Sequence, residues 1–383
     1  MRRAGKLAAI ILAAGCSSRA PGFKPLLPLG EATVIETAVG GLRRAGIGDI
    51  AVVVGHRAAD LQAVLGKLPV RTVPNEHYRA GMFSSVVAGV KALPADADAF
   101  FLLPADLPLV KSHTVRLLAR AGRKTGAAVV YPVFGGQRGH PPLIAARLAP
   151  AILGWGGTGG LRPLLARYEA DALDLSVIDE GILLDLDTAA DYRQLVMRHA
   201  GRHCPTGKEC EQLLARLGVP SPVADHSRVV AGVARRLAAG LNRAGCSLDE
   251  GLITAASLLH DLAKGRPDHP RRGARLIGRL GCPQVAAVVA AHHDKTFAAG
   301  QPLDEAAVVY LADKLVQNAT IVSLEERFSC PREKFADAAA QKALSERLAQ
   351  ARRIAAAVEQ ALGAELAAII KGDSPLPAGG DGI

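Results

Sequence analysis

The residues that decide the fold of the first half of the chain are LAAIILAAGCSSRAPGFK, positions 7–24. Positions 7–14 form an uninterrupted apolar run, which ends at Gly15 and leads into a loop with two cations, Arg19 and Lys24. Such an apolar run is typical of a strand buried in a parallel sheet. A loop of small residues after the strand lets backbone N–H groups approach phosphate oxygens closely. We therefore expect a phosphate-binding loop, although a plain strand–helix turn with two exposed cations would give the same pattern.

Strand and helix patterns alternate around this loop up to about position 195. The alternation predicts an α/β domain with a mostly parallel sheet and helices on both faces. Ligands of such sheets bind outside the carboxyl ends of the strands, so we expect the site in the loops after Leu12 and Leu103. The expected segments are a strand at 7–12, a helix at 32–45, a strand at 50–54, a helix at 58–65, a strand at 70–73, a helix at 84–91 and a strand at 99–103.

Two acidic positions strengthen the expectation of a site at the carboxyl ends of the strands. Asp106 follows the strand pattern at 99–103, where a carboxylate can hold magnesium. A second acidic cluster occupies positions 185–188, and there Asp187 or Thr188 could instead cap the next helix. Magnesium binding and helix capping are compatible, because neighbouring carboxylates can divide the two roles.

The pattern changes near position 203, after which helical patterns dominate and no strand pattern stands out. We predict an α/β domain at 1–200, an all-α domain at 205–371 and a tail at 372–383. The Gly, Pro and Asp content of the tail predicts disorder. The expected helices lie near position 213 and at 229–241, 252–262, 274–280, 285–293 and 306–316.

The second half also holds a series of histidines and aspartates that interrupt apolar helical stretches. Imidazole and carboxylate groups suit a hydrolytic metal such as iron, manganese or zinc. Burying several unpaired ionisable groups would be costly, so a shared metal explains the series better than separate buried side chains. The series consists of His226, His260, Asp261, His269, His292, His293 and Asp313.

Composition narrows the function classes. The chain has 383 residues and a formal net charge of +10, with 49% hydrophobic and 4% aromatic residues, and this length suits two domains. The basic balance suits an anionic substrate, but no Lys/Arg run is interleaved with aromatic residues, so we do not expect nucleic acid as a partner.

The apolar run at 7–14 is better explained as a first strand than as a signal peptide, and nothing predicts a membrane span. The six cysteines are dispersed without zinc-ribbon spacing, so we expect reduced thiols in a cytoplasmic protein.

Five motifs follow one another in the first half: Leu12–Arg19 with Lys24–Leu27, Asn75 with Gly81–Ser85, Leu103–Val110, Gly139–Pro142 and Asp185–Tyr192. Together they resemble the molybdenum cofactor nucleotidyltransferase family over about residues 6–196. The resemblance implies a Rossmann-like fold and transfer of a nucleotidyl group from an NTP to the terminal phosphate of molybdopterin, with release of pyrophosphate. Leu-Ala-Ala-Gly resembles the CTP-using branch, because the GTP-using branch usually has two glycines there.

The resemblance also implies roles for individual residues. Arg19 and Lys24 would bind the triphosphate, Asp106 and Asp187 would hold magnesium, and these four residues would be catalytic. His140 would lie on the acceptor side. CTP and a molybdopterin-type substrate are therefore the expected small-molecule partners, and a molybdenum hydroxylase apoenzyme is a further partner that the resemblance suggests. The expected nucleotide-binding residues are Leu12, Ala13, Ala14, Gly15, Arg19, Lys24, Asn75, Gly81 and Ser85, the last three near the base and ribose.

The histidine/aspartate series, with Leu258–Lys264 as its central motif and Leu311–Lys314 further on, resembles the HD-domain metal-dependent phosphohydrolases over about residues 205–330. The resemblance implies one or two divalent ions, with Asp261 also catalytic. Two ions would clamp the attacking and leaving oxygens of a phosphate ester and lower the pKa of a bridging water. Lys264 would meet a substrate phosphate or would be a solvated cation at a helix end. The implied core ligands are His226, His260, Asp261 and Asp313, and His269 and His292 would add the second ion.

Several interpretations stay open. The acceptor could be a sugar phosphate, an alcohol phosphate or another cofactor precursor. The first domain could be a nucleotide sensor, because Arg19-Ala20-Pro21-Gly22 stands where the family usually has Arg-Met-Gly, and Pro21 fixes φ and removes a donor. The second domain could be a metal-free scaffold that docks a molybdenum enzyme. As a phosphohydrolase, it could act on a nucleotide, a cyclic nucleotide or a by-product of the first domain.

Overall fold

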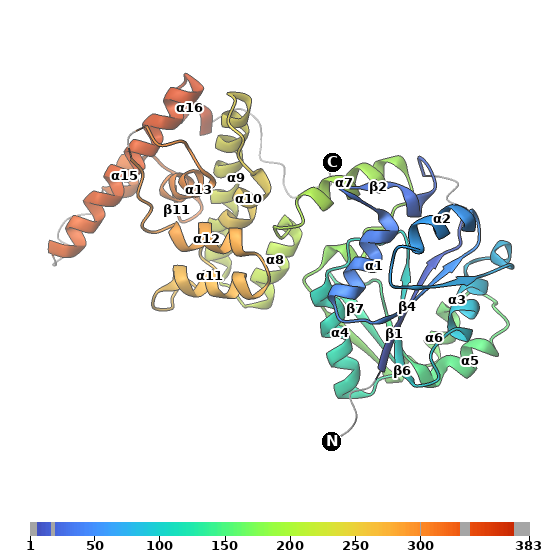
Figure 1. Ribbon diagram of the computed structural model, residues 1–383. Helices are drawn as coiled ribbons and strands as arrows, with labels where there is room; N and C mark the ends of the chain where they lie inside the picture. Colours follow the sequence, from blue (N-terminus) through green and yellow to red (C-terminus); the bar gives the residue numbers. More distant parts are fainter. Residues whose placement is uncertain (1–5, 17–19, 299, 330–337, 371–383) are drawn as a thin grey trace. The chain divides into compact units, whose positions relative to one another are not determined.

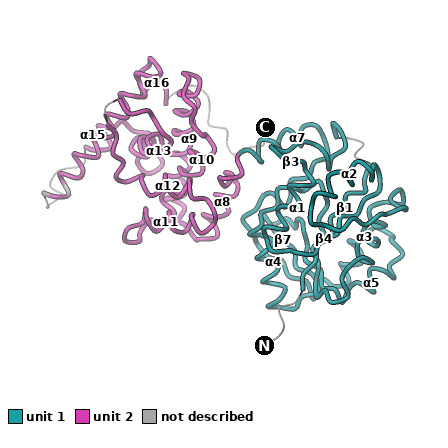
Figure 2. The backbone as a smooth tube through the Cα atoms, viewed as in Figure 1, with its two compact units in different colours: residues 1–200 teal, residues 201–383 magenta. Residues whose placement is uncertain are grey.

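A computed structural model describes residues 6–16, 20–298, 300–329 and 338–370. The chain divides into two compact units, residues 1–200 and 201–383 (Figure 2). The tail that we predict at 372–383 lies outside the described residues. None of the described helices combines the length and the hydropathy needed to cross a membrane.

The first unit is built on one mixed, mostly parallel sheet. Its central strand, β1 (Lys6–Ala13), contains most of the apolar run at 7–14, and it pairs in parallel with β4 (Asp49–Val54) and β6 (Ala97–Pro104). The strand β9 (Leu143–Ala145) is antiparallel to both of its neighbours. The sheet order is β10-β7-β9-β6-β1-β4-β5, with β8 paired to β7; the remaining bounds are β5 (Arg71–Pro74), β7 (Val129–Phe134), β8 (Gln137–Arg138) and β10 (Ala172–Ser176).

Helices cover both faces of this sheet (Figure 1). Alternate residues of β1 point to opposite faces, so Ile11 packs in one apolar core and Ile10 in the other. The first core also takes buried residues of α1 (Val34–Arg44), α2 (Ala58–Leu65) and α4 (Ser112–Thr125). The second takes buried residues of α3 (Met82–Lys91), α5 (Ala149–Leu153) and α6 (Arg162–Ala166). The predicted α/β architecture is confirmed, and the expected strands and helices lie within a few residues of their predicted bounds.

The register of the sheet brings two of the predicted loops together. Leu12 of β1 lies beside Pro104 of β6, and Ala105 N donates a hydrogen bond to the Leu12 carbonyl at 3.0 Å. A short antiparallel pair, β2 (Pro28–Leu29) and β3 (Ala32–Thr33), follows the first loop and leads into α1. The carboxyl ends of β1 and β6 therefore open onto the same edge of the sheet.

The second unit is helical around one apolar core, as predicted. A hairpin of two-residue strands, β11 (Val316–Gln317) and β12 (Thr320–Ile321), departs from the all-α prediction. Asn318 makes this turn possible by taking a left-handed conformation with φ 56°. The helices are α7 (Ala189–Ala200) at the end of the first unit and then α8 (Gly207–Arg216), α9 (Ser221–Arg243), α10 (Glu250–Leu259), α11 (His269–Arg279), α12 (Pro283–Ala291), α13 (Glu305–Lys314), α14 (Leu324–Phe328), α15 (Ala338–Leu362) and α16 (Leu366–Ile370).

Candidate active sites

The first candidate site lies where β1 and β6 end. Lys24 Nζ lies 2.6 Å from Asp187 Oδ1 and 3.2 Å from Asp106 Oδ2, so one ammonium group bridges both carboxylates. Burial lowers the pKa of Lys24, but its hydrogen bond to Asp187 and the charge of Asp106 outweigh that effect and raise the pKa. The structure thus brings together three of the residues that we predict for the nucleotide site.

The segment before α7 resolves the two interpretations of its acidic cluster. Asp191 Oδ2 accepts hydrogen bonds from Thr188 N at 2.7 Å and Thr188 Oγ1 at 2.9 Å, and Asp191 N donates back to Thr188 Oγ1 at 3.2 Å. This reciprocal pair is a capping box, so Thr188 caps the helix. The carboxylate of Asp187 is then available to Lys24.

Asp185 is a third carboxylate near the same site, to which the sequence analysis gave no role of its own. Burial raises its pKa, and the negative charges of Asp187 and Asp106 raise it further. Three neighbouring carboxylates favour a divalent cation, and oxygen ligands of this kind suit magnesium. The ammonium of Lys24 already lies between two of them, which shows that the site accepts positive charge. The residues present therefore fit a magnesium ion, with Asp106, Asp187 and Asp185 as the groups that would hold it.

The Gly139–Pro142 segment connects the two acidic elements. His140 N donates to the Ile182 carbonyl at 2.9 Å, and Leu102 N donates to the Pro142 carbonyl at 3.2 Å. A Cβ on Gly139 would lie 2.5 Å from the Ile182 carbonyl oxygen, so only glycine allows this close approach. Burial lowers the pKa of His140 and keeps its imidazole neutral near neutral pH. Its Nδ1 is buried without a hydrogen-bond partner among the described residues.

The other predicted nucleotide-binding residues are placed as follows. Asn75 is buried, and its Nδ2 donates to the hydroxyls of Ser84 and Ser85 at 2.9 Å each, so these three side chains brace the turn before α3. Gly81 precedes α3 with φ 101° and is exposed. Leu12 and Ala13 end β1, Ala14 is buried and Gly15 is exposed, whereas Arg19 lies outside the described residues. The binding roles of these residues stay predictions.

A separate cavity of about 920 Å³ lies at the opposite, amino end of the strands. Its charged lining includes Lys6 and Arg116, together with Arg71, which pairs with Asp49 at 2.6 Å. No residue of the five motifs lines it. Because parallel sheets bind ligands at the carboxyl ends of their strands, we expect the nucleotide at Lys24 rather than in this cavity.

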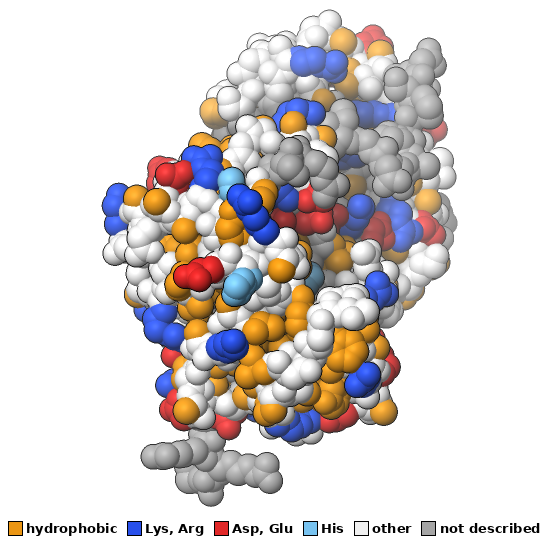
Figure 3. All heavy atoms as spheres, turned by 90° about the vertical axis from the view of Figure 1, so that its right-hand side faces the viewer, with side chains coloured by type: hydrophobic (Ala, Val, Ile, Leu, Met, Phe, Trp, Pro, Cys, Tyr) orange, Lys and Arg blue, Asp and Glu red, His pale blue; other side chains and the backbone are white. Residues whose placement is uncertain are grey.

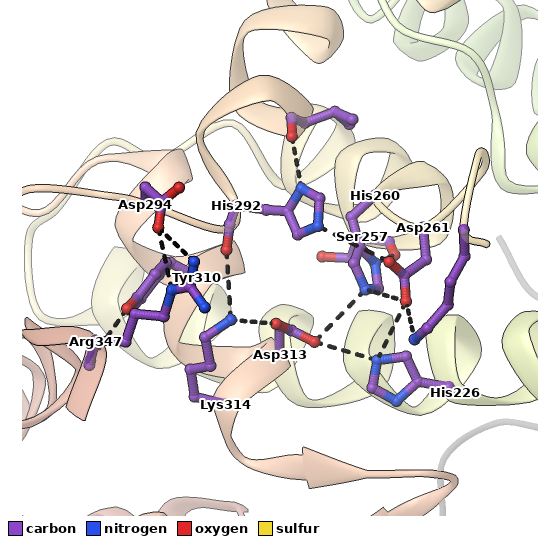
Figure 4. A network of polar contacts seen from close by, with 12 residues as sticks. His226, Ser257, His260, Asp261, His292, Asp294, Tyr310, Asp313, Lys314 and Arg347 are labelled. Carbon is purple, nitrogen blue, oxygen red and sulfur yellow. Dashed lines mark hydrogen bonds and ion pairs between the residues drawn. The ribbon is translucent and has the colours of Figure 1, made fainter. Parts of the chain in front are cut away.

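The second candidate site is a buried cluster of histidines and aspartates in the helical unit (Figure 4). Asp313 Oδ1 lies 3.1 Å from His226 Nε2 and 3.5 Å from His260 Nε2. Asp261 Oδ2 lies 3.4 Å from His260 Nε2. These groups come from α9, the end of α10 and α13, so helix packing assembles the cluster from distant parts of the sequence.

The backbone orients three of the histidines. The Nδ1 atoms donate to backbone carbonyls: His226 to Asn318 at 2.6 Å, His260 to Ser257 at 2.7 Å and His292 to Val289 at 2.6 Å. A carbonyl only accepts, so each Nδ1 carries a proton, and Nε2 is the nitrogen that faces inward. A hydrogen bond from the other ring nitrogen to a backbone carbonyl is typical of metal-binding histidines. The turn at Asn318, which the sequence did not predict, therefore orients His226.

A second histidine group adjoins the first. His269, at the start of α11, has Nε2 3.2 Å from Asp261 Oδ1, and His292 Nε2 lies 3.8 Å from the same oxygen. His269, His292 and His293 each offer a nitrogen within 4.8 Å of the others. Burial lowers the pKa of His292 to about 3 and that of His293 to about 4, so both are neutral and able to bind a metal at neutral pH.

This donor set fits divalent metal. His260 Nε2 and His269 Nε2 are buried 3.2–3.5 Å from carboxylate oxygens, yet neither makes an aligned hydrogen bond among the described residues, which is costly unless a ligand satisfies them. Burial favours neutral His260, but Asp261 and Asp313 outweigh burial and raise its pKa to about 10. A metal would replace that proton and satisfy the same carboxylates. His226, His260, Asp261 and Asp313 would hold one ion, and His269 and His292 would help to hold a second.

A cavity of about 180 Å³ opens beside these ligands, and cations that the sequence analysis gave no role line it. They are Lys314, next to Asp313, and Arg327 and Arg347, which follow in α14 and α15. Lys264, which the sequence placed either at a substrate or in solvent, lines the same cavity and pairs with Asp261 Oδ2. In the sequence, Lys314 could have indicated this cationic lining, because it is a cation within an apolar helical stretch. The two arginines occur in helical patterns where charged residues are expected to be exposed, so they gave no such indication.

Figure 3 shows one face of the protein. The Lys and Arg side chains of the described residues on that face lie scattered among apolar and acidic ones.

Comparisons with known proteins agree with this division of the chain. Residues 9–172 match the MobA-like NTP transferase domain, and residues 223–318 match the HD domain. The nicotine blue oxidoreductase of Paenarthrobacter nicotinovorans is 33% identical over 49% of this chain and 95% of its own length. The molybdenum cofactor cytidylyltransferase of Escherichia coli is 25% identical over 48% of this chain and 92% of its own length. The crystal structure of Rv0371c from Mycobacterium tuberculosis matches 51% of this chain and 99% of the Rv0371c chain, with 25% sequence identity and a TM-score of 0.45.

The family assignment follows from the two domain matches and the relative with 33% identity, together with the two sites. The N-terminal unit has the strand-end constellation of Lys24, Asp106 and Asp187, and the C-terminal unit has the buried histidine/aspartate cluster. The chain belongs to the MobA-like NTP transferase family and carries an HD phosphohydrolase domain after its nucleotidyltransferase domain.

Proposed function

We propose that the N-terminal unit transfers the cytidylyl group of CTP to the terminal phosphate of a molybdopterin-type acceptor and releases pyrophosphate. The observation that carries the proposal is that Lys24, Asp106 and Asp187, far apart in the sequence, meet at the carboxyl ends of β1 and β6. The match to 92% of the E. coli cytidylyltransferase supports the choice of nucleotide and acceptor. The Leu-Ala-Ala-Gly form of the first loop supports CTP over GTP.

The reaction needs positioning and charge neutralisation more than covalent chemistry by the protein. An oxygen of the acceptor phosphate would bond to the α-phosphorus of CTP, while the bond to the bridging oxygen breaks and pyrophosphate leaves with that electron pair. Magnesium, when bound, would neutralise charge on the phosphates. Lys24 would exchange its carboxylate partners for phosphate oxygens, and the neutral His140 would face the acceptor side.

The test is an assay of pyrophosphate release by the purified full chain with CTP, Mg²⁺ and molybdopterin. We expect turnover with CTP, weaker turnover with GTP, and turnover lowered by about 10²-fold in Asp106→Asn. Turnover with a sugar phosphate or alcohol phosphate but not with molybdopterin would replace the proposed acceptor and keep the reaction class. Nucleotide binding without turnover on any acceptor would favour the nucleotide-sensor interpretation.

A second candidate for this unit is a redox reaction, because the relative with 33% identity is named an oxidoreductase. The same loop after β1 could then bind a dinucleotide. Oxidation of NADH or NADPH by a quinone-like dye would be measured with the same protein preparation. Dye-dependent oxidation that survives Asp106→Asn, together with no pyrophosphate release, would favour this candidate.

For the C-terminal unit, we propose hydrolysis of a phosphate ester or anhydride by water. The observation that carries this proposal is the pair of buried imidazole nitrogens, His260 Nε2 and His269 Nε2, aimed at the carboxylates without hydrogen-bond partners among the described residues. A metal ion, when bound, would lower the pKa of a coordinated water. Metal analysis of the purified protein is the first test. An apoprotein that folds normally and stays inactive after loading with Mn²⁺, Fe²⁺ or Zn²⁺ would favour the scaffold interpretation.

A further inference from the structure

The HD cavity has a cationic side that metal binding does not use. Lys314 is only 6% exposed, and its Nζ lies 2.6 Å from Asp313 Oδ2 and 3.5 Å from the His292 carbonyl. The same ammonium lies 4.8 Å from the centre of the Tyr310 ring. A lysine this deeply buried loses much of its hydration, so it is retained at a cost unless it has a strong anionic partner. Asp313 Oδ1 faces the histidines and Oδ2 faces Lys314, so an ion held through Oδ1 would share the charge of Asp313 and leave Lys314 able to attract a further anion.

Two arginines extend this cationic side. Arg347 donates from Nε at 3.1 Å and from Nη2 at 2.9 Å to Asp294 Oδ1, and Tyr310 Oη donates to the Arg347 carbonyl at 3.1 Å (Figure 4). The bonds to Asp294 hold one edge of the guanidinium, and Arg347 also lines the cavity. Arg327 Nε is buried without a hydrogen-bond partner among the described residues. The arginines therefore offer donors in a fixed arrangement, which is what planar recognition of phosphate requires.

The cavity is small for a nucleotide. Its volume is about 180 Å³, whereas pockets that enclose drug-sized ligands are roughly 300–1,000 Å³. Its apolar lining consists of Phe328 and Leu344, and its other lining residues are charged or histidine. Such a cavity offers little surface to a base and sugar but many partners to a compact polyanion.

We propose that this site binds and hydrolyses inorganic pyrophosphate, with Lys314, Arg327 and Arg347 binding the phosphate that leaves. The proposal rests on the phosphohydrolase function proposed for this unit. Water forms a bond to one phosphorus, and the bond from that phosphorus to the bridging oxygen breaks. The bridging oxygen leaves with the electron pair on the second phosphate, and the protons of water remain on the two orthophosphates. No further reactant is needed.

This activity would act on the product of the N-terminal unit. Nucleotidyl transfer releases one pyrophosphate per turnover and is reversible, so its hydrolysis removes a product and draws the transfer forward. One chain would then contain the reaction that makes pyrophosphate and the reaction that consumes it. The coupling needs no contact between the two units, because pyrophosphate diffuses freely.

The experiment uses the full-length, Mn²⁺-loaded protein and adds pyrophosphate directly, so it does not depend on the N-terminal reaction. Orthophosphate release would be compared for pyrophosphate, CTP and p-nitrophenyl phosphate, and formation of the nucleoside monophosphate would be measured for a cyclic nucleotide. We expect pyrophosphate to be hydrolysed with the highest kcat/KM. Hydrolysis of the other substrates but not of pyrophosphate would overturn the substrate assignment and keep the phosphohydrolase. No hydrolysis of any substrate by metal-loaded protein would overturn both.

A binding measurement tests the cationic residues separately from activity. Imidodiphosphate, which is not cleaved at the bridge, would be titrated by calorimetry into the wild type, Arg347→Gln, Arg327→Gln and Lys314→Gln. Loss of a charged hydrogen bond predicts affinity weakened at least about tenfold in each variant, with unchanged metal content. Arg353→Gln is the matched control, since Arg353 is exposed on the same helix α15 and does not line the cavity. Unchanged affinity in Arg347→Gln and Arg327→Gln would contradict the proposal even if the buried Lys314→Gln fails to fold.

Discussion

The two sites of this chain differ in how they are built. In the N-terminal site the side chains of Lys24, Asp106 and Asp187 are 15%, 26% and 34% exposed and come from connecting segments between the long helices and strands. In the C-terminal site the side chains of Asp261 and Asp313 are 5% and 8% exposed and come from packed helices. Magnesium usually binds through one or two carboxylates together with substrate phosphates, whereas a buried histidine/aspartate cage can hold its metal alone. The comparison therefore suggests an ion that arrives with the nucleotide in one unit and a resident ion in the other.

The largest expected effect comes from Asp313→Asn. The change removes a charged ligand that faces both His226 and His260. We expect hydrolysis by the C-terminal unit to fall about 10³-fold, since a metal contributes several kcal/mol to transition-state stabilisation. Hydrolysis of p-nitrophenyl phosphate and pyrophosphate, with metal content by mass spectrometry, would measure it. Nucleotidyl transfer by the same variant is the control and should be unchanged.

Asp106→Asn should lower nucleotidyl transfer by about 10²-fold, because Lys24, Asp187 and Asp185 remain to hold charge in that site. Pyrophosphate release with saturating CTP would measure the loss. Hydrolysis in the C-terminal unit should be unaffected, and the content of resident metal should stay at the wild-type level. A fall in resident metal in this variant would contradict the view that the two units bind their ions independently.

Metal removal should separate the stabilities of the two units. With free metal at 100 times its Kd, a site that binds only the folded state gains about 2.7 kcal/mol. We expect chelation to lower the melting transition of the C-terminal unit in calorimetry and to leave that of the N-terminal unit in place. Addition of CTP with Mg²⁺ should raise the N-terminal transition and so identify it. Equal shifts of both transitions on chelation would remove the distinction between resident and arriving ions.

The smallest expected effect concerns Asp185→Asn in the magnesium-free protein. Burial and the charges of Asp187 and Asp106 raise the pKa of Asp185 in the folded state, so its ionised form is disfavoured by folding. That cost is full above the folded pKa and disappears as the pH falls through it toward the unfolded value. The variant should therefore be more stable at neutral pH, by less than about 0.5 kcal/mol for this exposed group, and equal to the wild type in acid. Urea unfolding at both pH values would show the difference, and destabilisation at neutral pH would reverse the interpretation.

The sequence by itself determined the two architectures and the types of ligand. Apolar runs and helical periodicity are local properties, so β1, α1 and the helices of the second unit could be predicted from neighbouring residues. The histidine/aspartate series was visible because ionisable groups in apolar helices are unusual. The hairpin at 316–321 could not be predicted, because strands of two residues carry no periodicity.

Only the tertiary structure decided which groups meet. Lys24 bridges carboxylates that are 82 and 163 positions away, and Arg347 lines the same cavity as Asp261 and Asp313. The carbonyl of Asn318 orients His226 across 92 positions. These contacts depend on sheet register and helix packing, which combine distant segments, so no local pattern could reveal that the HD site has a cationic side. The sequence supplied the chemical groups. The fold left the N-terminal site open, so that its substrate completes it, and buried the C-terminal site, whose groups are in place before a ligand binds.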